Sequence, residues 1–203
     1  MDEFYVNLTS GKTECSWVLA YYGIVSKAIN DNNFKKCAEV GIGYGLHAKE
    51  ILDNTNLEHL YLIDPYHFYP NDFFVDDVNR SGGFEVLAKN VKLNLDVHKS
   101  RYTWYRKCST EVTNDEIPND FLDLVFIDAD HSYIAVTNDL NFWWEKIRKG
   151  GWLMGDDYMS CWPETKKAVD DWANKMNLKI QFREKKHPVV KNSKYLIYYF
   201  IKN

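Results

Sequence analysis

The sequence predicts a three-layer α/β domain whose seven-stranded sheet is mostly parallel and ends in an antiparallel hairpin. Short apolar runs alternate with helical patterns along the chain, a glycine-rich turn follows the first run, and no helix separates the last two runs. Strands joined by a short link pair antiparallel, so the chain should close in a hairpin. The 203 residues contain no obvious linker, which predicts one domain spanning residues 1–203.

The first half of the chain is expected to supply three helices and three strands. The first helix covers 14–30, where Trp17, Ala20, Ile24 and Ala28 recur at helical spacing. The other elements follow in the order strand 36–40, helix 47–54, strand 59–63, helix 84–99 and strand 103–106. An aromatic loop at 65–83 comes after the second strand, and it could form a lid over an acceptor or pack on the core.

The second half contains the clearest strand in the chain. Residues 121–128 include a continuous apolar run, as expected of a strand buried on both faces. A helix at 133–148 follows, and Gly150-Gly151 predicts a turn before a fifth strand at 152–155. The remaining elements are a helix at 163–176 and two closing strands at 178–183 and 195–201. The predicted sheet is therefore parallel over five strands and antiparallel at its end.

Composition excludes several classes of function. Apolar residues make up 45% and charged residues 27%, as in soluble globular proteins, and the net charge of −4 does not suggest a nucleic-acid partner. The four cysteines form no C-x-x-C pair and indicate reduced thiols of an intracellular protein. With no signal peptide and no apolar run long enough to span a membrane, we expect a cytoplasmic protein without a membrane partner.

A glycine-rich turn is the first indication of a bound ligand. Gly41, Gly43 and Gly45 alternate with other residues directly after the first strand and before a helix. Glycines in such a turn let the backbone bend sharply and approach a ligand. The alternative is a tight strand-to-helix turn that binds nothing. Leu46 stands where the dinucleotide fingerprint has its third glycine, which points away from NAD and toward S-adenosylmethionine.

An acidic residue follows the glycine turn at a distance typical of nucleotide-binding βαβ units. Asp64 ends the second predicted strand, about 20 residues after the turn. In this position a carboxylate can accept hydrogen bonds from a ribose. Because Pro65 comes next, Asp64 could instead cap the following turn. We favour the ribose contact.

Three more carboxylates should meet at the same edge of the sheet. Asp128 ends the fourth strand, and Asp156 and Asp157 end the fifth. The carboxyl ends of parallel strands face the ligand crevice, where three carboxylates repel one another unless a cation neutralises them. Oxygen ligands of this kind suit Mg²⁺, with Mn²⁺ or Ca²⁺ as alternatives. Without a metal, Asp128 would bind only a cofactor and the other two carboxylates would cap the next helix.

The segments 125–133 (VFIDADHSY) and 149–158 (KGGWLMGDDY) together carry a resemblance to a known family. From about residue 14 to its end, the chain resembles the class I S-adenosylmethionine-dependent methyltransferases, which have a Rossmann-like fold with a reversed last strand. Within that class it looks most like the metal-dependent small-molecule O-methyltransferases, a branch that includes macrolide-sugar and catechol-type enzymes. The resemblance implies S-adenosyl-L-methionine as the methyl donor and a divalent metal, with Asp128, Asp156 and Asp157 as its ligands.

The resemblance also implies roles for single residues. Glu39 would lie near the amino-acid moiety of the cofactor, or it could accept hydrogen bonds from loop amides. Ser109 would flank the adenine, although it could equally cap a helix. His131, three residues after Asp128, stands where relatives place their proton acceptor, so Asp128 and His131 become the predicted catalytic pair. We interpret Asp130 as the N-cap of the following helix rather than as a ligand.

The resulting hypothesis is O-methylation of a hydroxyl on a small acceptor, a sugar or glycan. A metal would position the hydroxyl and lower its pKa, and His131 would take the proton. One alternative is a nicotinamide-dependent oxidoreductase, which Leu46 and the closing hairpin oppose. Another is a non-catalytic or differently reacting member of the methyltransferase fold. A homo-oligomer stays open, and the sequence does not identify the acceptor.

Overall fold

The computed structural model describes residues 23–67, 78–79, 82–186 and 194–203. Their strands form one seven-stranded sheet in the order β3-β2-β1-β4-β5-β7-β6. The strands are β1 Lys36–Val40, β2 His59–Ile63, β3 Tyr102–Tyr105, β4 Leu122–Ile127, β5 Ile147–Gly155, β6 Gln181–Lys186 and β7 Lys194–Ile201. The first five pair parallel, and β7 pairs antiparallel with both β5 and β6. The predicted fold class is confirmed.

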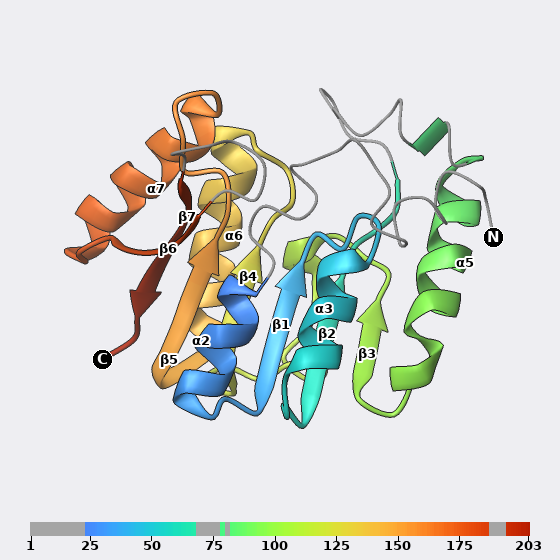
Figure 1. The fold of residues 1–203 in the computed structure, drawn as a ribbon. Coiled ribbons are helices and arrows are strands. Elements are labelled where there is room, and N and C mark those ends of the chain that lie inside the picture. Colours follow the sequence, from blue (N-terminus) through green and yellow to red (C-terminus); the bar gives the residue numbers. More distant parts are fainter. Residues whose placement is uncertain (1–22, 68–77, 80–81, 187–193) are drawn as a thin grey trace.

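Helices cover both faces of the sheet, which makes three layers (Figure 1). They are α2 Ile24–Asn32, α3 Leu46–Asn54, α5 Phe84–Leu95, α6 Tyr133–Lys146 and α7 Pro163–Met176, with 3₁₀ turns η2 Asp96–His98 and η3 Ser109–Glu111. Side chains of β4 alternate between two apolar cores. Leu124 and Phe126 pack with α2, α3 and α5, whereas Val125 and Ile127 pack with α6 and α7. Burial on both faces explains the continuous apolar run of β4.

Several predicted boundaries are wrong. Most importantly, Gly150-Gly151 lies within β5, and the preceding helix ends at Lys146 rather than at 148. A β-carbon at Gly151 would come within 2.8 Å of the Asp123 carbonyl oxygen, so this glycine lets β5 run close beside β4. Smaller shifts affect the other ends: β3 starts and ends one residue early, β6 starts at Gln181, and η2 follows the end of α5.

Some predictions fall partly outside the described residues. The predicted helix 14–30 is described only from Gly23 onward, where α2 begins at Ile24. Most of the aromatic loop 65–83 also lies outside the described part. Among the described helices, none is both long and apolar enough to cross a membrane.

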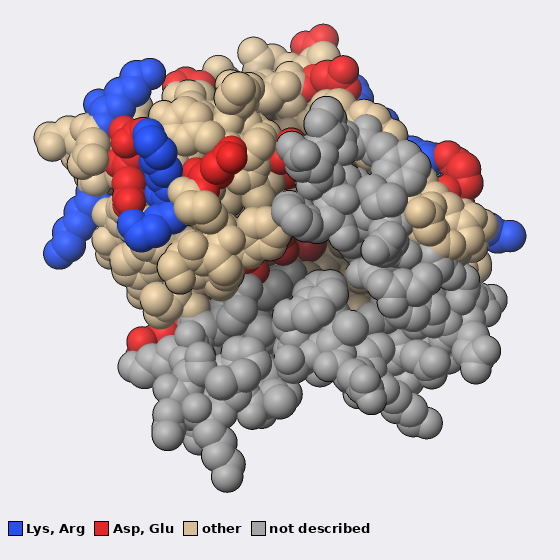
Figure 2. Space-filling model, turned by 90° about the horizontal axis from the view of Figure 1, so that it is seen from above, with Lys and Arg blue, Asp and Glu red and all other residues tan. Residues whose placement is uncertain are grey.

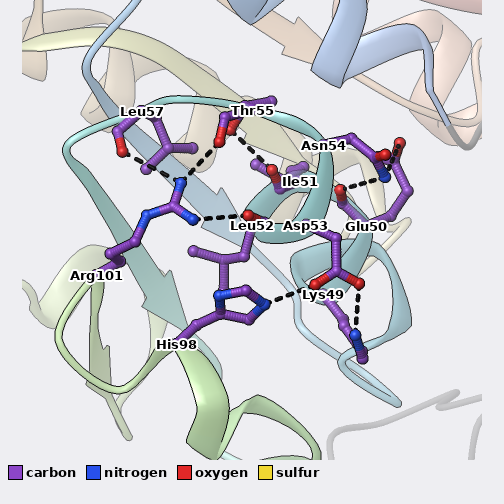
Figure 3. Close-up of polar contacts among 10 residues, drawn as sticks. All are labelled: Lys49, Glu50, Ile51, Leu52, Asp53, Asn54, Thr55, Leu57, His98 and Arg101. Carbon is purple, nitrogen blue, oxygen red and sulfur yellow. Dashed lines mark hydrogen bonds and ion pairs between the residues drawn. The ribbon is translucent and has the colours of Figure 1, made fainter.

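One arginine links α3 to β3 at the side of the sheet where the parallel strands begin (Figure 3). The Arg101 guanidinium donates to the backbone carbonyls of Leu52, Thr55 and Leu57 at 2.7–3.2 Å. These carbonyls lie at and beyond the end of α3, where helical partners are missing. Beside it, His98 binds Asp53 at 2.6 Å. The contacts tie the carboxyl end of α3 to the start of β3, far from the opposite edge where the predicted site residues lie.

Candidate active site

Backbone hydrogen bonds continue past the ends of the parallel strands and align the predicted site residues. The Gly41 amide donates to Ile63, the Asp128 amide to Val40 and the Asp156 amide to Ile127, at 2.8–3.1 Å. The glycine turn, Asp64, Asp128 and the Asp156-Asp157 pair therefore leave the sheet along one edge, at the top of Figure 1. In open α/β sheets this is the edge where ligands bind.

Asp64 holds the glycine turn through backbone amides. Its Oδ2 accepts hydrogen bonds from the amides of Ile42 at 2.9 Å and Gly43 at 3.2 Å. Its Oδ1 accepts from the amide of Tyr66 at 2.8 Å, and the Tyr66 hydroxyl donates to the Gly43 carbonyl at 2.6 Å. The hydrogen bond from Tyr66 agrees with the alternative that Asp64 caps the following turn, whereas its contacts with the glycine turn were not predicted. Its contact with a ribose stays a prediction.

The glycine positions are required by close packing and by backbone conformation. Gly41 and Gly45 have φ values of 87° and 70°, which side-chain-bearing residues rarely adopt. A β-carbon at Gly41 would overlap the carbonyl of Asp128, and one at Gly45 would lie 2.6 Å from Val91 Cγ1. Gly43 also has a positive φ of 51°. The glycines therefore let the backbone of the turn pack closely against the end of β4 and against α5.

Glu39 lies beneath the turn in a buried pair with His47. The two side chains are 2% and 3% exposed, and Glu39 Oε1 lies 3.2 Å from His47 Nδ1. Burial raises the pKa of Glu39, and the neighbouring His47 opposes this shift. Within the described residues, Oε2 of Glu39 has no hydrogen-bond partner. A buried carboxylate oxygen of this kind is available to a donor on a ligand.

Asp128, His131 and Asp157 gather at the ends of β4 and β5. One ligand atom from each lies within 4.8 Å of the others, although 26 residues separate His131 from Asp157. His131 Nε2 lies 2.5 Å from Asp157 Oδ2 and 3.9 Å from Asp128 Oδ1. The Trp162 ring stacks on the imidazole with centroids 4.3 Å apart and an angle of 16°. The imidazole is thus held between an aromatic face and two carboxylates.

Competing influences act on the protonation of His131. Burial lowers its pKa, but the hydrogen bond to Asp157 and the charges of Asp157, Asp128 and Asp130 raise it, and the net shift is upward. Without a bound cation the imidazolium form is therefore more favourable than in a free histidine. A cation beside Asp128 and Asp157 would act in the opposite direction.

The side chains of Asp156 and Asp157 make different contacts. Asp156 is 4% exposed, and its Oδ1 accepts the backbone amide of Asp157 at 2.7 Å. Among the described residues, it is outside the group formed by Asp128, His131 and Asp157. Asp157 has a φ of 58°, in the left-handed region that aspartate tolerates better than most residues. This backbone conformation places its carboxylate beside His131.

Ser109 points into a buried polar contact that sequence reasoning missed. Its hydroxyl donates to Asp139 on α6 at 2.5 Å and accepts from Trp143 Nε1 at 2.8 Å. Ser109 opens η3, but the capping residue of this turn is Cys108. The signal that could have revealed Asp139 is its place in the predicted helix 133–148, where it falls among the apolar residues Val136, Leu140 and Trp143.

Seen from above the ligand edge, acidic atoms lie near the middle of this face, partly behind residues drawn in grey (Figure 2). The mixed charges at the left belong to the side of the molecule occupied by α7 in Figure 1. There Lys166 pairs with Asp170 and Lys167 with Asp171, as expected of a solvated helix face. Lys166 and Lys167 are thus neutralised by carboxylates of the same helix.

The sequence pattern of the methyltransferase domain matches residues 38–158, a span that contains every predicted site residue. The chain belongs to the methyltransferase-domain family. A curated relative of this methyltransferase domain is the uncharacterized protein R132 of Acanthamoeba polyphaga mimivirus. The two are 31% identical over 150 residues, which is 68% of this chain and 61% of R132. The chain therefore spans about three fifths of the length of this relative.

Solved structures share the fold of this methyltransferase domain. One of them is the O-methyltransferase TomG from Streptomyces achromogenes in complex with S-adenosylmethionine. Its alignment covers the whole of this chain and 91% of TomG, with 11% identity and a TM-score of 0.68. The alignment with the spermidine synthase of Thermotoga maritima covers the whole of this chain and 61% of the synthase, with 15% identity and a TM-score of 0.58. The predicted class I S-adenosylmethionine-dependent methyltransferase fold is confirmed.

Proposed function

We propose that this methyltransferase domain moves a methyl group from S-adenosyl-L-methionine to a hydroxyl oxygen of a small acceptor, a sugar or glycan. One observation carries the proposal: Asp128, His131 and Asp157 gather within 4.8 Å of one another on the edge of the sheet that also bears the glycine turn. A proton acceptor and two carboxylates therefore lie beside the position expected for the methyl end of the cofactor.

The reaction requires alignment and removal of one proton. The methyl carbon forms a bond with the acceptor oxygen as its bond to sulfur breaks, so the positive sulfonium becomes a neutral thioether. The hydroxyl proton must leave the oxygen, and His131 Nε2 is the proposed acceptor. Asp157 and the Trp162 ring hold the imidazole in one orientation. Most of the acceleration would come from holding oxygen, carbon and sulfur in line.

The proposed cofactor contacts follow the carboxyl edge from β1 to β3. Glu39 and the turn of Gly41, Gly43 and Gly45 would hold the methionine part, with Asp128 beside its methyl end. Asp64 would bind the ribose and Ser109 the adenine. The buried Oε2 of Glu39 supports a contact with the cofactor's ammonium group, because a cation there would satisfy the carboxylate.

The residues present fit a divalent cation. Carboxylate oxygens about 2 Å from an octahedral ion lie about 3–4 Å apart, and Asp128 and Asp157 have carboxylate oxygens within 4.8 Å of each other. Asp128 and Asp157 are the proposed carboxylate ligands. Asp156, the third predicted ligand, is outside this group, and its Oδ1 accepts the Asp157 amide. A bound cation would supply Lewis-acid polarisation of the acceptor hydroxyl.

An aromatic wall beside His131 supports a sugar acceptor. Trp162 stacks against the imidazole, and a ring in this position presents apolar surface to the faces of a sugar. The aromatic content of 16% is high, and most of the aromatic loop 65–83 lies outside the described residues. The domain would thus bind its acceptor beside the stacked pair of Trp162 and His131, with one hydroxyl directed at His131 Nε2.

A methyl-transfer screen tests the proposal. Methyl-labelled S-adenosylmethionine is incubated with the protein and with panels of sugars, glycans and phenols, each with and without chelator. We expect labelled product from a sugar or glycan, and less of it after chelation. Calorimetric titration with S-adenosylhomocysteine and NAD distinguishes the nicotinamide alternative. Binding of NAD but not of S-adenosylhomocysteine would overturn the proposal.

A further inference from the structure

A buried carboxyl outside the group of Asp128, His131 and Asp157 controls the hydrogen bonding of Ser109. Asp139 on α6 is 5% exposed and accepts the Ser109 hydroxyl at 2.5 Å. The indole nitrogen of Trp143, one helical turn further along α6, donates to the same Ser109 oxygen at 2.8 Å. Among the described residues, no cation pairs with Asp139, so its contact with Ser109 is a main source of stabilisation for a charge at this position.

This contact lies next to the proposed nucleoside site. Ser109 opens the turn that follows β3, and the preceding Cys108 has its sulfur 3.9 Å from His67 Nε2 in the loop after β2. That loop also contains Asp64, which caps the glycine turn. The inference therefore rests on the proposed function, in which the ribose lies at Asp64 and the base at Ser109.

Counting hydrogen bonds defines what Ser109 can offer to a ligand. A serine hydroxyl has one proton to donate and two lone pairs to accept with. The Ser109 proton goes to Asp139 and one lone pair is used by Trp143. One lone pair is left. While Asp139 is ionised, Ser109 can therefore accept a hydrogen bond from a ligand but cannot donate one.

We propose that Asp139 is a positioning residue that keeps Ser109 as an acceptor, so that the site selects a purine with an amino group over one with a carbonyl oxygen at the same place. An amino group would donate to the remaining lone pair of Ser109. A carbonyl oxygen would face that lone pair without a proton between them. A mismatch of this kind commonly lowers affinity about tenfold or more.

The surroundings of Asp139 make this selection sensitive to pH. The titratable groups that face it are Asp130 after β4, Cys108 before η3 and Tyr198 on β7, and none of these becomes a cation. Burial raises the pKa of Asp139 to about 7, Ser109 opposes the shift and Asp130 adds to it. A protonated Asp139 would donate to Ser109, whose own proton could then turn toward a ligand carbonyl.

The experiment compares two ligands that differ only at the amino position. Calorimetry on the full chain measures the affinities of S-adenosylhomocysteine and S-inosylhomocysteine, which carries a carbonyl oxygen instead of the amino group, at pH 6 and pH 8.5. We expect the amino ligand to bind at least tenfold tighter at pH 8.5 and the preference to shrink at pH 6. In Asp139→Asn, whose neutral amide can donate or accept, the preference should fall several-fold and lose its dependence on pH.

Two further variants make the test specific. Ser109→Ala should lose the preference as Asp139→Asn does, which covers the case in which one variant fails to fold. Thr110→Ala removes the neighbouring exposed hydroxyl and should keep the preference of the wild type. An Asp139→Asn protein that binds both ligands with wild-type ratios at both pH values would overturn the inference. A wild type that binds neither ligand would instead overturn the proposed function on which the inference rests.

Discussion

The backbone of Gly41 lies directly against the carbonyl group of Asp128. A β-carbon built on Gly41 would come within 1.8 Å of the Asp128 carbonyl oxygen, far inside any allowed contact. The main chain of Gly41, the first glycine of the turn, is therefore in van der Waals contact with the main chain of Asp128, whose side chain belongs to the candidate metal group. The proposed cofactor and metal sites are adjacent at this point, so a substitution in one should alter ligand binding at the other.

Gly41→Ala should damage both folding and cofactor binding. The substitution would combine a strained φ of 87° with overlap against backbone atoms that cannot rotate away. We expect a loss of more than about 2 kcal/mol in the free energy of unfolding. Gly23→Ala is the matched control, because Gly23 has a similar φ of 84° and, among the described atoms, its β-carbon would meet only Glu50 Oε1 at 3.9 Å. Equal destabilisation of the two variants in chemical unfolding would contradict this packing argument.

Asp64→Ala should weaken binding of S-adenosylhomocysteine at least tenfold. It would remove the acceptor for the amides of Ile42, Gly43 and Tyr66 together with the proposed ribose acceptor. Calorimetry measures the affinity, and ligand-free thermal unfolding shows how much of the effect comes from a loosened turn. Asp53→Ala, at the other end of α3, is the control with unchanged affinity. Wild-type affinity in a folded Asp64→Ala protein would show that the adenosine lies elsewhere.

His131→Gln should lower turnover roughly 10²–10⁴-fold while cofactor affinity stays near the wild-type value. The upward shift of the His131 pKa predicts that the imidazole of the metal-free protein, followed by NMR titration, titrates above the ordinary value of 6.5. Because the folded pKa exceeds the unfolded one, the His131–Asp157 pair stabilises the metal-free protein fully below the unfolded pKa. This contribution is lost as pH rises through the folded pKa.

Two measurements check the role of His131. The pH–rate profile of the variant on a confirmed acceptor should lack the acidic limb. Thermal unfolding across pH in the presence of chelator should show a smaller acid-side stabilisation in His131→Gln than in the wild type. Near wild-type turnover in the variant would exclude His131 as the base.

A divalent cation should stabilise the wild type and restore activity after chelation. With Mg²⁺ or Mn²⁺ at 100 times its dissociation constant, binding adds about 2.7 kcal/mol to the free energy of unfolding. Asp157→Asn should abolish this thermal shift, whereas Asp170→Asn on α7 should keep it. Asp156→Asn tests whether Asp156 joins Asp128 and Asp157 as a ligand, because the thermal shift survives this substitution only if Asp156 does not bind the cation. Full activity after chelation, with no metal detected by elemental analysis, would eliminate the metal from the mechanism.

Asp139 should make the protein less stable as pH rises from about 4 to 7. Its pKa is raised from 3.8 to about 7 on folding, so the folded state holds more protons than the unfolded state in this window. Stability therefore falls with increasing pH, by an amount of the order of a few kcal/mol. Chemical unfolding at pH 5 and pH 8 should show a smaller difference for Asp139→Asn than for the wild type. An unchanged slope would place the titration in another group.

Much of the fold follows from local patterns that the sequence displays directly. The apolar run of β4, the glycine turn and the closing hairpin each depend on neighbouring residues, and they predict the sheet with its antiparallel end. Gly150-Gly151 was misleading because turn and strand glycines look alike. Only the position of Asp123 across the sheet explains why Gly151 belongs to a strand.

The candidate site was less accessible to prediction, because its contacts join distant parts of the chain. Strand order predicts that Asp128 and Asp157 share an edge, but the hydrogen bond between His131 and Asp157 depends on the loop conformations after β4 and β5. Asp64 was foreseen, as an alternative, only as the cap of the following turn, because its contacts with the Ile42 and Gly43 amides join residues about 20 positions apart. The Ser109–Asp139 contact spans 30 residues and requires the packing of α6 on η3.

The left-handed backbone of Asp157 limits which residues evolution can use at this position. A φ of 58° costs a non-glycine residue about 1 kcal/mol, and β-branched side chains fit it worst. Glycine would relieve that cost but would leave His131 without its partner. Asparagine fits the backbone but carries no charge. Selection for stability and selection for chemistry therefore favour different residues at this single site, and aspartate is the one that serves the chemistry.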